Sequence, residues 1–126
     1  MSMRSPLRDA RGLGAAGDGT HHWIVQRISG VALIPLNLWF IYNALYLVTL
    51  SHAKVAVWIG SPINTTLLVL LVASVFYHSQ LGLQVVIEDY IPAKGPKVVM
   101  LLATQFINAF LAVAGILAVL KIAFGA

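Results

Sequence analysis

The residues with the clearest chemical potential lie in one stretch, FYHSQLGLQVVIEDY, which runs from Phe76 to Tyr90. A histidine stands in its apolar part, and two carboxylates and a tyrosine close it. A neutral imidazole can bind a metal ion, and a phenol beside a carboxylate can donate a hydrogen bond to a carbonyl oxygen. The stretch therefore combines a candidate metal ligand, His78, with a candidate polar pocket at Asp89 and Tyr90.

The spacing of these residues predicts how a helix would arrange them. His78 and Asp89 are eleven residues apart. On an α-helix this separation is a rotation of about 1100°, or three turns plus about 20°, and a rise of roughly 16 Å. We therefore expect both side chains on one face, with Asp89 at the helix end before Pro92 and His78 deeper. Carboxylates in the last turn oppose the helix dipole, so local propensity does not explain Glu88 and Asp89.

The chain that must position these residues is strongly apolar. Of its 126 residues 60% are hydrophobic and 10% are charged, whereas roughly a quarter are charged in soluble domains. Three runs of the chain carry no charge, residues 28–53, 55–87 and 98–120. Because about 20 apolar residues span a bilayer as a helix, we predict an all-α membrane protein. Its three transmembrane helices are expected at about 25–50, 63–90 and 98–121.

Basic residues predict the orientation of these helices, because they favour the cytoplasmic side of a membrane. Six lie before the first helix or in the 91–97 loop: Arg4, Arg8, Arg11, Arg27, Lys94 and Lys97. Only Lys54 and Lys121 fall on the other side. We therefore predict a cytoplasmic N-terminal arm over 1–22, which lacks the apolar segment of a signal peptide. A single three-helix membrane domain follows over 23–126.

Several classes of function are disfavoured by composition. The chain has no cysteine, which excludes disulfides and cysteine-ligated iron–sulfur clusters within it. Its net charge of +4 is spread over chain ends and loops, so we expect no nucleic-acid partner. Three helices cannot form the inverted pair of repeats common in transporters. Four amide side chains are predicted to form hydrogen bonds between helices: Asn37, Asn43, Gln105 and Asn108. Gly115 is predicted to be a site where two helices pack closely.

Two interpretations of His78 remain open on spacing alone. Ionisable groups in the hydrocarbon face a bundle interior or a cofactor, so His78 is either an axial haem ligand or a histidine hydrogen-bonded to a neighbouring helix. Gly82, one turn on, leaves room for a flat group. His21 and His22 precede the first helix and His52 lies in the outer loop, so a haem with two histidine ligands would require a second chain.

The remaining candidates also have two interpretations each. On the residues alone, Asp89 and Tyr90 are better explained as an anchor at the membrane surface than as a quinone pocket. Arg27 is either a basic residue that extends its charge to the cytoplasmic surface or the partner of an anion such as a haem propionate. His21 or His22 could assist it.

Three segments together resemble a known family. They are RGLGAAGDGTHHWIVQRISGVAL over 11–33, the His-x3-Gly of HSQLG, and EDY with its aspartate eleven residues after the histidine. They are similar to the small hydrophobic membrane-anchor subunit of succinate dehydrogenase, respiratory complex II, of the alphaproteobacterial type. The sister cytochrome b subunit carries SPHLxIY and HxxxGxRHLxxD stretches. Both are absent here, which favours the anchor.

The resemblance implies roles for the candidate residues. It implies that His78 is an axial ligand of haem b, with the second ligand from the cytochrome b subunit. Arg27 and either His21 or His22 would lie near the haem propionates. Tyr90 would donate a hydrogen bond to a ubiquinone carbonyl, with Asp89 as its acidic neighbour.

The resemblance also implies partners and a location. FAD and the iron–sulfur clusters would belong to a flavoprotein subunit and an iron–sulfur subunit, which this chain would dock to the bacterial inner membrane. The C-terminus would be periplasmic, and the complex would serve the tricarboxylic acid cycle and the respiratory chain. Two alternatives stay open: the anchor of a quinol:fumarate reductase, and a structural membrane scaffold without haem.

Overall fold

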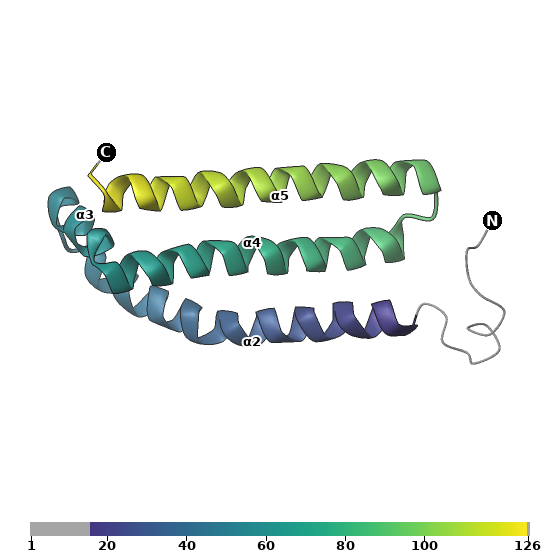
Figure 1. The fold of residues 1–126 in the computed structure, drawn as a ribbon, viewed down its shortest axis with the longest axis horizontal. Helices are drawn as coiled ribbons and strands as arrows, with labels where there is room; N and C mark the ends of the chain where they lie inside the picture. Colours follow the sequence, from purple (N-terminus) through teal and green to yellow (C-terminus); the bar gives the residue numbers. More distant parts are fainter. Residues whose placement is uncertain (1–15, 126) are drawn as a thin grey trace.

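The computed structural model describes residues 16–125, and every regular element in that part is an α-helix. The helices are α2 (Ala16–Leu47), α3 (His52–Gly60), α4 (Pro62–Tyr90) and α5 (Lys94–Ala123). Three of them, α2, α4 and α5, are long and apolar enough to cross a membrane. Figure 1 shows these three helices side by side, with α3 at one end. The prediction of an all-α protein with three spanning helices is confirmed.

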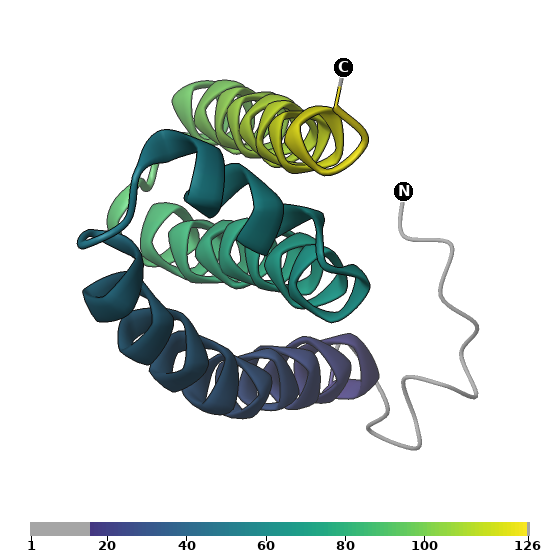
Figure 2. The same cartoon turned by 90° about the vertical axis from the view of Figure 1, so that its left-hand side faces the viewer.

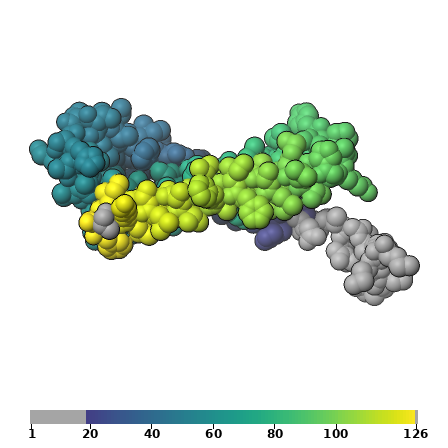
Figure 3. All heavy atoms as spheres, turned by 90° about the horizontal axis from the view of Figure 1, so that it is seen from above, coloured from purple at the N-terminus to yellow at the C-terminus, as the bar shows by residue number. Residues whose placement is uncertain are grey.

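The three long helices form a row with α4 in the middle. Helix α4 packs against both α2 and α5, and the end-on view in Figure 2 shows it between them. The buried apolar side chains of the described part all belong to α4: Leu68, Leu71, Leu81 and Ile87. Figure 3 shows α5, from green to yellow, open along the length of the molecule. The outer faces of α2 and α5 are thus left for lipid or for other chains.

The two ends of the molecule differ in their basic residues. The start of α2 and the connection from α4 to α5 lie at one end, and α3 and the end of α5 lie at the other (Figure 1). Lys94 and Lys97 therefore lie at the same end of the molecule as the half of α2 that carries Arg27. Lys54 and Lys121 lie at the opposite end. Which end faces the cytoplasm stays a prediction. Three of the counted arginines lie outside the described residues: Arg4, Arg8 and Arg11.

The first spanning helix has different bounds from the predicted 25–50. Helix α2 begins at Ala16 and so includes residues 16–22, which we assigned to the N-terminal arm. Residues 1–15 lie outside the described part, so the division into an arm and a membrane domain stays a prediction. The helix ends at Leu47, where the Thr49 hydroxyl donates to the Tyr46 carbonyl oxygen at 2.7 Å. The chain therefore forms a non-helical turn here, and the helix does not continue.

Helix α3 is an element that the sequence analysis did not predict. It begins after Ser51, whose extended backbone (φ −69°, ψ 156°) separates it from α2. The Trp58 ring stacks on Trp39 of α2 with centroids 5.7 Å apart. Asn64 of α4 donates to the Trp58 carbonyl oxygen at 2.9 Å. These contacts hold α3 against the ends of its two neighbours.

The other helix ends follow from three prolines. Pro62 is the first residue of α4, and Ile91, before Pro92, has an extended backbone that ends the helix at Tyr90, as expected. Helix α5 begins at Lys94 instead of residue 98. Pro96 lies in its first turn, where backbone N–H groups have no partner within the helix, so the missing donor is tolerated. The connection is therefore only residues 91–93.

Polar and small residues join α4 to α5. The Asn108 amide donates to Oε1 of Gln80 at 2.8 Å, which confirms an interhelical bond for this asparagine. A Cβ atom on Gly115 would lie 3.0 Å from a methyl carbon of Val72, which confirms the close contact there. The prediction is wrong for Asn43, whose amide donates to the Trp39 carbonyl oxygen of its own helix at 2.8 Å. The other two predicted amides, Asn37 and Gln105, are exposed.

Candidate functional site

His78 of α4 faces α2 and contacts the side chain of Ser29. Its Nδ1 atom lies 2.9 Å from Oγ of Ser29, and that hydroxyl lies 2.9 Å from the carbonyl oxygen of Gln26. A Cβ atom on the next residue, Gly30, would lie 3.4 Å from Cε1 of His78. The α2 backbone at Gly30 is therefore close to the ring, within van der Waals reach of a single added carbon. Together these contacts fix the imidazole between the two helices.

A hollow of about 470 Å³ opens beside this ring. One face of α2 forms most of it, and His78 is its only lining residue from α4. Arg27 also lines it, and its guanidinium carbon lies 5.3 Å from the centroid of the Trp23 ring. Such a cation–π contact is worth about 0.5–1 kcal/mol at an exposed site. The structure thus brings His78 and Arg27, which come from different helices, to one hollow.

The residues of this hollow fit a haem group. Within the described part, Nε2 of His78 has no hydrogen bond, so one ring nitrogen remains available as a ligand. A histidine nitrogen can ligate haem iron, and a guanidinium that lines the same hollow can pair with a haem carboxylate. No cluster of three or more metal-ligating side chains occurs in the described part. If a haem bound here, His78 would be the residue of the described part placed to ligate it.

The other histidines do not line this hollow. His21 is exposed, and His22 is half-buried with an Nε2 atom that is buried and has no hydrogen-bond partner among the described residues. His52 is exposed at the far end of the molecule, in α3. The expected place of His21 or His22 near the propionates stays a prediction.

Asp89 and Tyr90 lie at the end of α4, apart from the hollow. Both are exposed, Tyr90 to 80%, and neither side chain has a hydrogen bond within the described part. Their neighbour Glu88 differs, because its Oε1 accepts a hydrogen bond from Gln84 at 3.0 Å. Asp89 is eleven helix positions from His78, or roughly 16 Å along the axis. The pair is therefore available to a molecule at the membrane surface, while His78 lies deeper.

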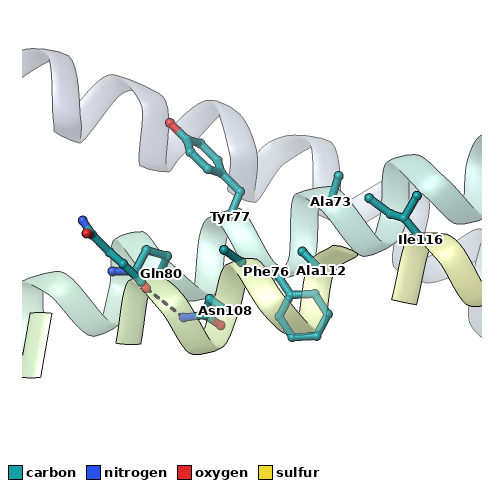
Figure 4. A pocket seen from close by; sticks show the side chains of 9 residues that line it. Ala73, Phe76, Tyr77, Gln80, Asn108, Ala112 and Ile116 are labelled. Atoms are coloured by element: carbon teal, nitrogen blue, oxygen red, sulfur yellow. Dashed lines mark hydrogen bonds between the residues drawn. The ribbon is translucent and has the colours of Figure 1, made fainter. Parts of the chain in front are cut away.

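A second hollow, of about 410 Å³, lies between α4 and α5. Figure 4 shows Gln80 and Asn108 on its wall, joined by their hydrogen bond, with Phe76 and Ala112 nearby. Its lining includes no histidine, carboxylate or basic residue. It has no imidazole or thiolate to ligate haem iron and no cation to pair with carboxylates, so the hollow beside His78 is the candidate site.

Sequence reasoning missed two residues of this site. Ser29 and Gly30 follow two and three residues after Arg27 in QRISG, but only the arginine was assigned a role. The signal was a hydroxyl and a glycine in succession on an apolar helix. Such a pair allows another helix to pack closely and offers its side chains a hydrogen-bond partner, but nothing in the sequence indicated which helix would pack there.

Comparison with known proteins places the chain in a family. The family described as succinate dehydrogenase/fumarate reductase transmembrane subunit matches residues 1–121. The succinate dehydrogenase hydrophobic membrane anchor subunit of Rickettsia bellii is 35% identical over 118 residues, covering 93% of this chain and 94% of that protein. The subunit of the same name from Paracoccus denitrificans is 29% identical over 107 residues, covering 84% and 82%. No solved structure matches the chain. The chain therefore belongs to the succinate dehydrogenase/fumarate reductase transmembrane subunit family and is of the alphaproteobacterial membrane-anchor type.

Proposed function

We propose that the chain anchors a succinate:quinone oxidoreductase in the bacterial inner membrane. The relatives named as anchors of succinate dehydrogenase support this role, as do three spanning helices whose outer faces are uncovered. A flavoprotein subunit with FAD and an iron–sulfur subunit would dock at the cytoplasmic end. A cytochrome b subunit would cover part of the exposed apolar surface.

Within this complex His78 would hold haem b as an axial ligand of its iron. The observation that supports this assignment is that His78, whose Nε2 has no hydrogen bond in the described part, lines the same hollow as Arg27. The second ligand is a histidine of the cytochrome b subunit. When bound, the haem accepts and donates single electrons. The residues of this chain hold the imidazole in place and provide a cation toward the carboxylates.

Tyr90 and Asp89 contribute to the site where ubiquinone is reduced. The Tyr90 hydroxyl is exposed and without a partner in the described part, so it can donate to a quinone carbonyl oxygen. The Asp89 carboxylate beside it can orient that phenol or accept a proton from it. Electrons would reach the quinone from the iron–sulfur subunit, so this chain performs no chemistry on succinate.

The test is purification of the chain with its native partners, followed by a haem spectrum. We expect a flavoprotein, an iron–sulfur protein and one cytochrome b to co-purify with it. His78→Ala removes the axial nitrogen, so the haem b absorbance and the low-spin electron paramagnetic resonance signal should be lost or perturbed. His52→Ala is the matched control, because this exposed histidine lies at the opposite end of the molecule. Both signals should survive that change.

Two results would contradict the proposal in different ways. A haem signal that is absent from the unaltered complex, or unchanged by His78→Ala, favours a structural scaffold without an axial ligand. A complex that reduces fumarate with quinol faster than it oxidises succinate favours the anchor of a quinol:fumarate reductase, which the same family includes. Isolation of the chain alone as a stable oligomer would exclude the anchor role.

A further inference from the structure

The hydroxyl of Ser29 has a defined role in the hydrogen bonds around His78. It lies 2.9 Å from the carbonyl oxygen of Gln26 and 2.9 Å from Nδ1 of His78. A carbonyl oxygen can only accept, so for both contacts to be hydrogen bonds the hydroxyl must donate its single proton to Gln26. Toward His78 the serine oxygen can then only accept. The hydrogen between them therefore belongs to Nδ1.

This assignment determines which nitrogen of the ring carries a lone pair. A neutral imidazole has one N–H group and one bare nitrogen, so a proton on Nδ1 leaves Nε2 bare. Only a bare nitrogen can bind a metal ion. We propose that Ser29 is a positioning residue that holds His78 in the tautomer that ligates haem iron through Nε2. This inference rests on the proposed role of His78.

The surroundings of Ser29 suit such a role. Histidines that bind metals generally donate their second N–H to a fixed acceptor, which sets the ring orientation and raises the basicity of the ligand. Here the acceptor is held by the α2 backbone through Gln26, and a hydroxyl that donates one hydrogen bond becomes a better acceptor of another. The residue after Ser29, Gly30, also packs near the ring, since a Cβ atom there would be 3.4 Å from Cε1 of His78.

The experiment compares four variants in the complete complex: Ser29→Ala, Ser29→Thr, Ser79→Ala and His78→Ala. Ser79→Ala is the matched control, because it removes a hydroxyl beside the ligand that has no hydrogen bond within the described part. Haem content, the electron paramagnetic resonance signal and the haem reduction potential are measured in each.

Ser29→Ala should weaken haem retention by about 10–100-fold, the usual effect of losing such a partner. The reduction potential of the haem in this variant should rise, because an imidazole without a hydrogen-bond acceptor at Nδ1 donates less electron density to iron. Ser29→Thr keeps the hydroxyl and should restore both properties. Ser79→Ala should match the unaltered complex.

Each contrary outcome identifies what is wrong. If His78→Ala abolishes the signal but Ser29→Ala changes neither retention, signal nor potential, the positioning role is excluded and the ligand stands. Equal loss in Ser29→Ala, Ser29→Thr and Ser79→Ala indicates a packing effect and also excludes it. If His78→Ala leaves the haem signal unchanged, the proposed ligand fails and the role of Ser29 fails with it.

Discussion

His78 of α4 and Arg27 of α2 line the same hollow, although they lie on different helices and are 51 positions apart in the sequence (78 − 27). The ring is fixed by Ser29, two residues after the arginine and less than one turn of α2 away. One segment of α2 thus supplies both a partner for the imidazole and a cation beside it. This arrangement separates the two tasks, which makes them testable one at a time.

Arg27→Gln should lower the reduction potential of the haem and leave its axial ligation intact. A cation near the haem favours the reduced form, which carries one positive charge fewer. Because the guanidinium is exposed in this chain, we expect a shift equivalent to about 0.2–1 kcal/mol. Redox titration measures the potential, and electron paramagnetic resonance checks the ligation. Lys121→Gln removes the same charge at the opposite end and should have no effect; an equal shift in both variants would exclude a local role.

Gly115→Leu should loosen the packing of α5 on α4. A Cβ atom at Gly115 already lies 3.0 Å from a methyl carbon of Val72, and overpacking costs about 1–3 kcal/mol. The better helix propensity of leucine returns less than about 1 kcal/mol, so the net effect should be destabilising. The measurement is the temperature at which the detergent-solubilised complex aggregates. Ala114→Leu adds similar bulk at an exposed neighbour, and an equal loss there would show that the Val72 contact is unimportant.

The spanning helices could be predicted because each depends on a local property, a long run without charge. The ends at Tyr90 and Pro62 followed from proline in the same way. The end of α2 at Leu47 could not be predicted, because residues 28–53 carry no charge and the turn that follows is closed by hydrogen bonds from Thr49 and Leu50 back to the end of the helix. Helix α3 was not predicted either, because it spans the break at Lys54 between two charge-free runs, and its place depends on contacts with residues distant in the sequence, such as Trp39.

The candidate site was predictable only in part for a similar reason. A histidine at membrane depth stands out because it is costly there, so His78 was found from its type and position. Ser29 and Gly30 are ordinary residues in a membrane helix, and their meaning comes from meeting that ring across the α2–α4 interface. Helical spacing relates residues of one helix, but it does not indicate which faces of two helices meet.

The topology can be tested with reporter fusions at the two ends of α5. A reporter after Ala126 should be active in the periplasm, and one inserted in the 91–93 connection should be active in the cytoplasm. Three spans require the two sites to lie on opposite sides, and the bias of basic residues sets which side is which. A reporter after Ser51, between α2 and α3, provides an internal check and should be periplasmic. A cytoplasmic signal after Ala126 would mean an even number of spans or an inverted orientation.

Tyr90→Phe should slow the reduction of quinone by succinate tenfold or more, which corresponds to about 1.4 kcal/mol in the barrier. The change removes one exposed hydroxyl and keeps the ring, so assembly should be preserved. The bond from this hydroxyl should strengthen as the quinone oxygen gains negative charge, so turnover should suffer more than binding. Succinate oxidation with a soluble acceptor that takes electrons from the flavin should stay normal.

Tyr42→Phe, at a tyrosine exposed to 77%, is the control and should change neither assay. If both assays fall together for Tyr90→Phe, the tyrosine has a structural role at the membrane surface; if neither changes, the quinone binds elsewhere.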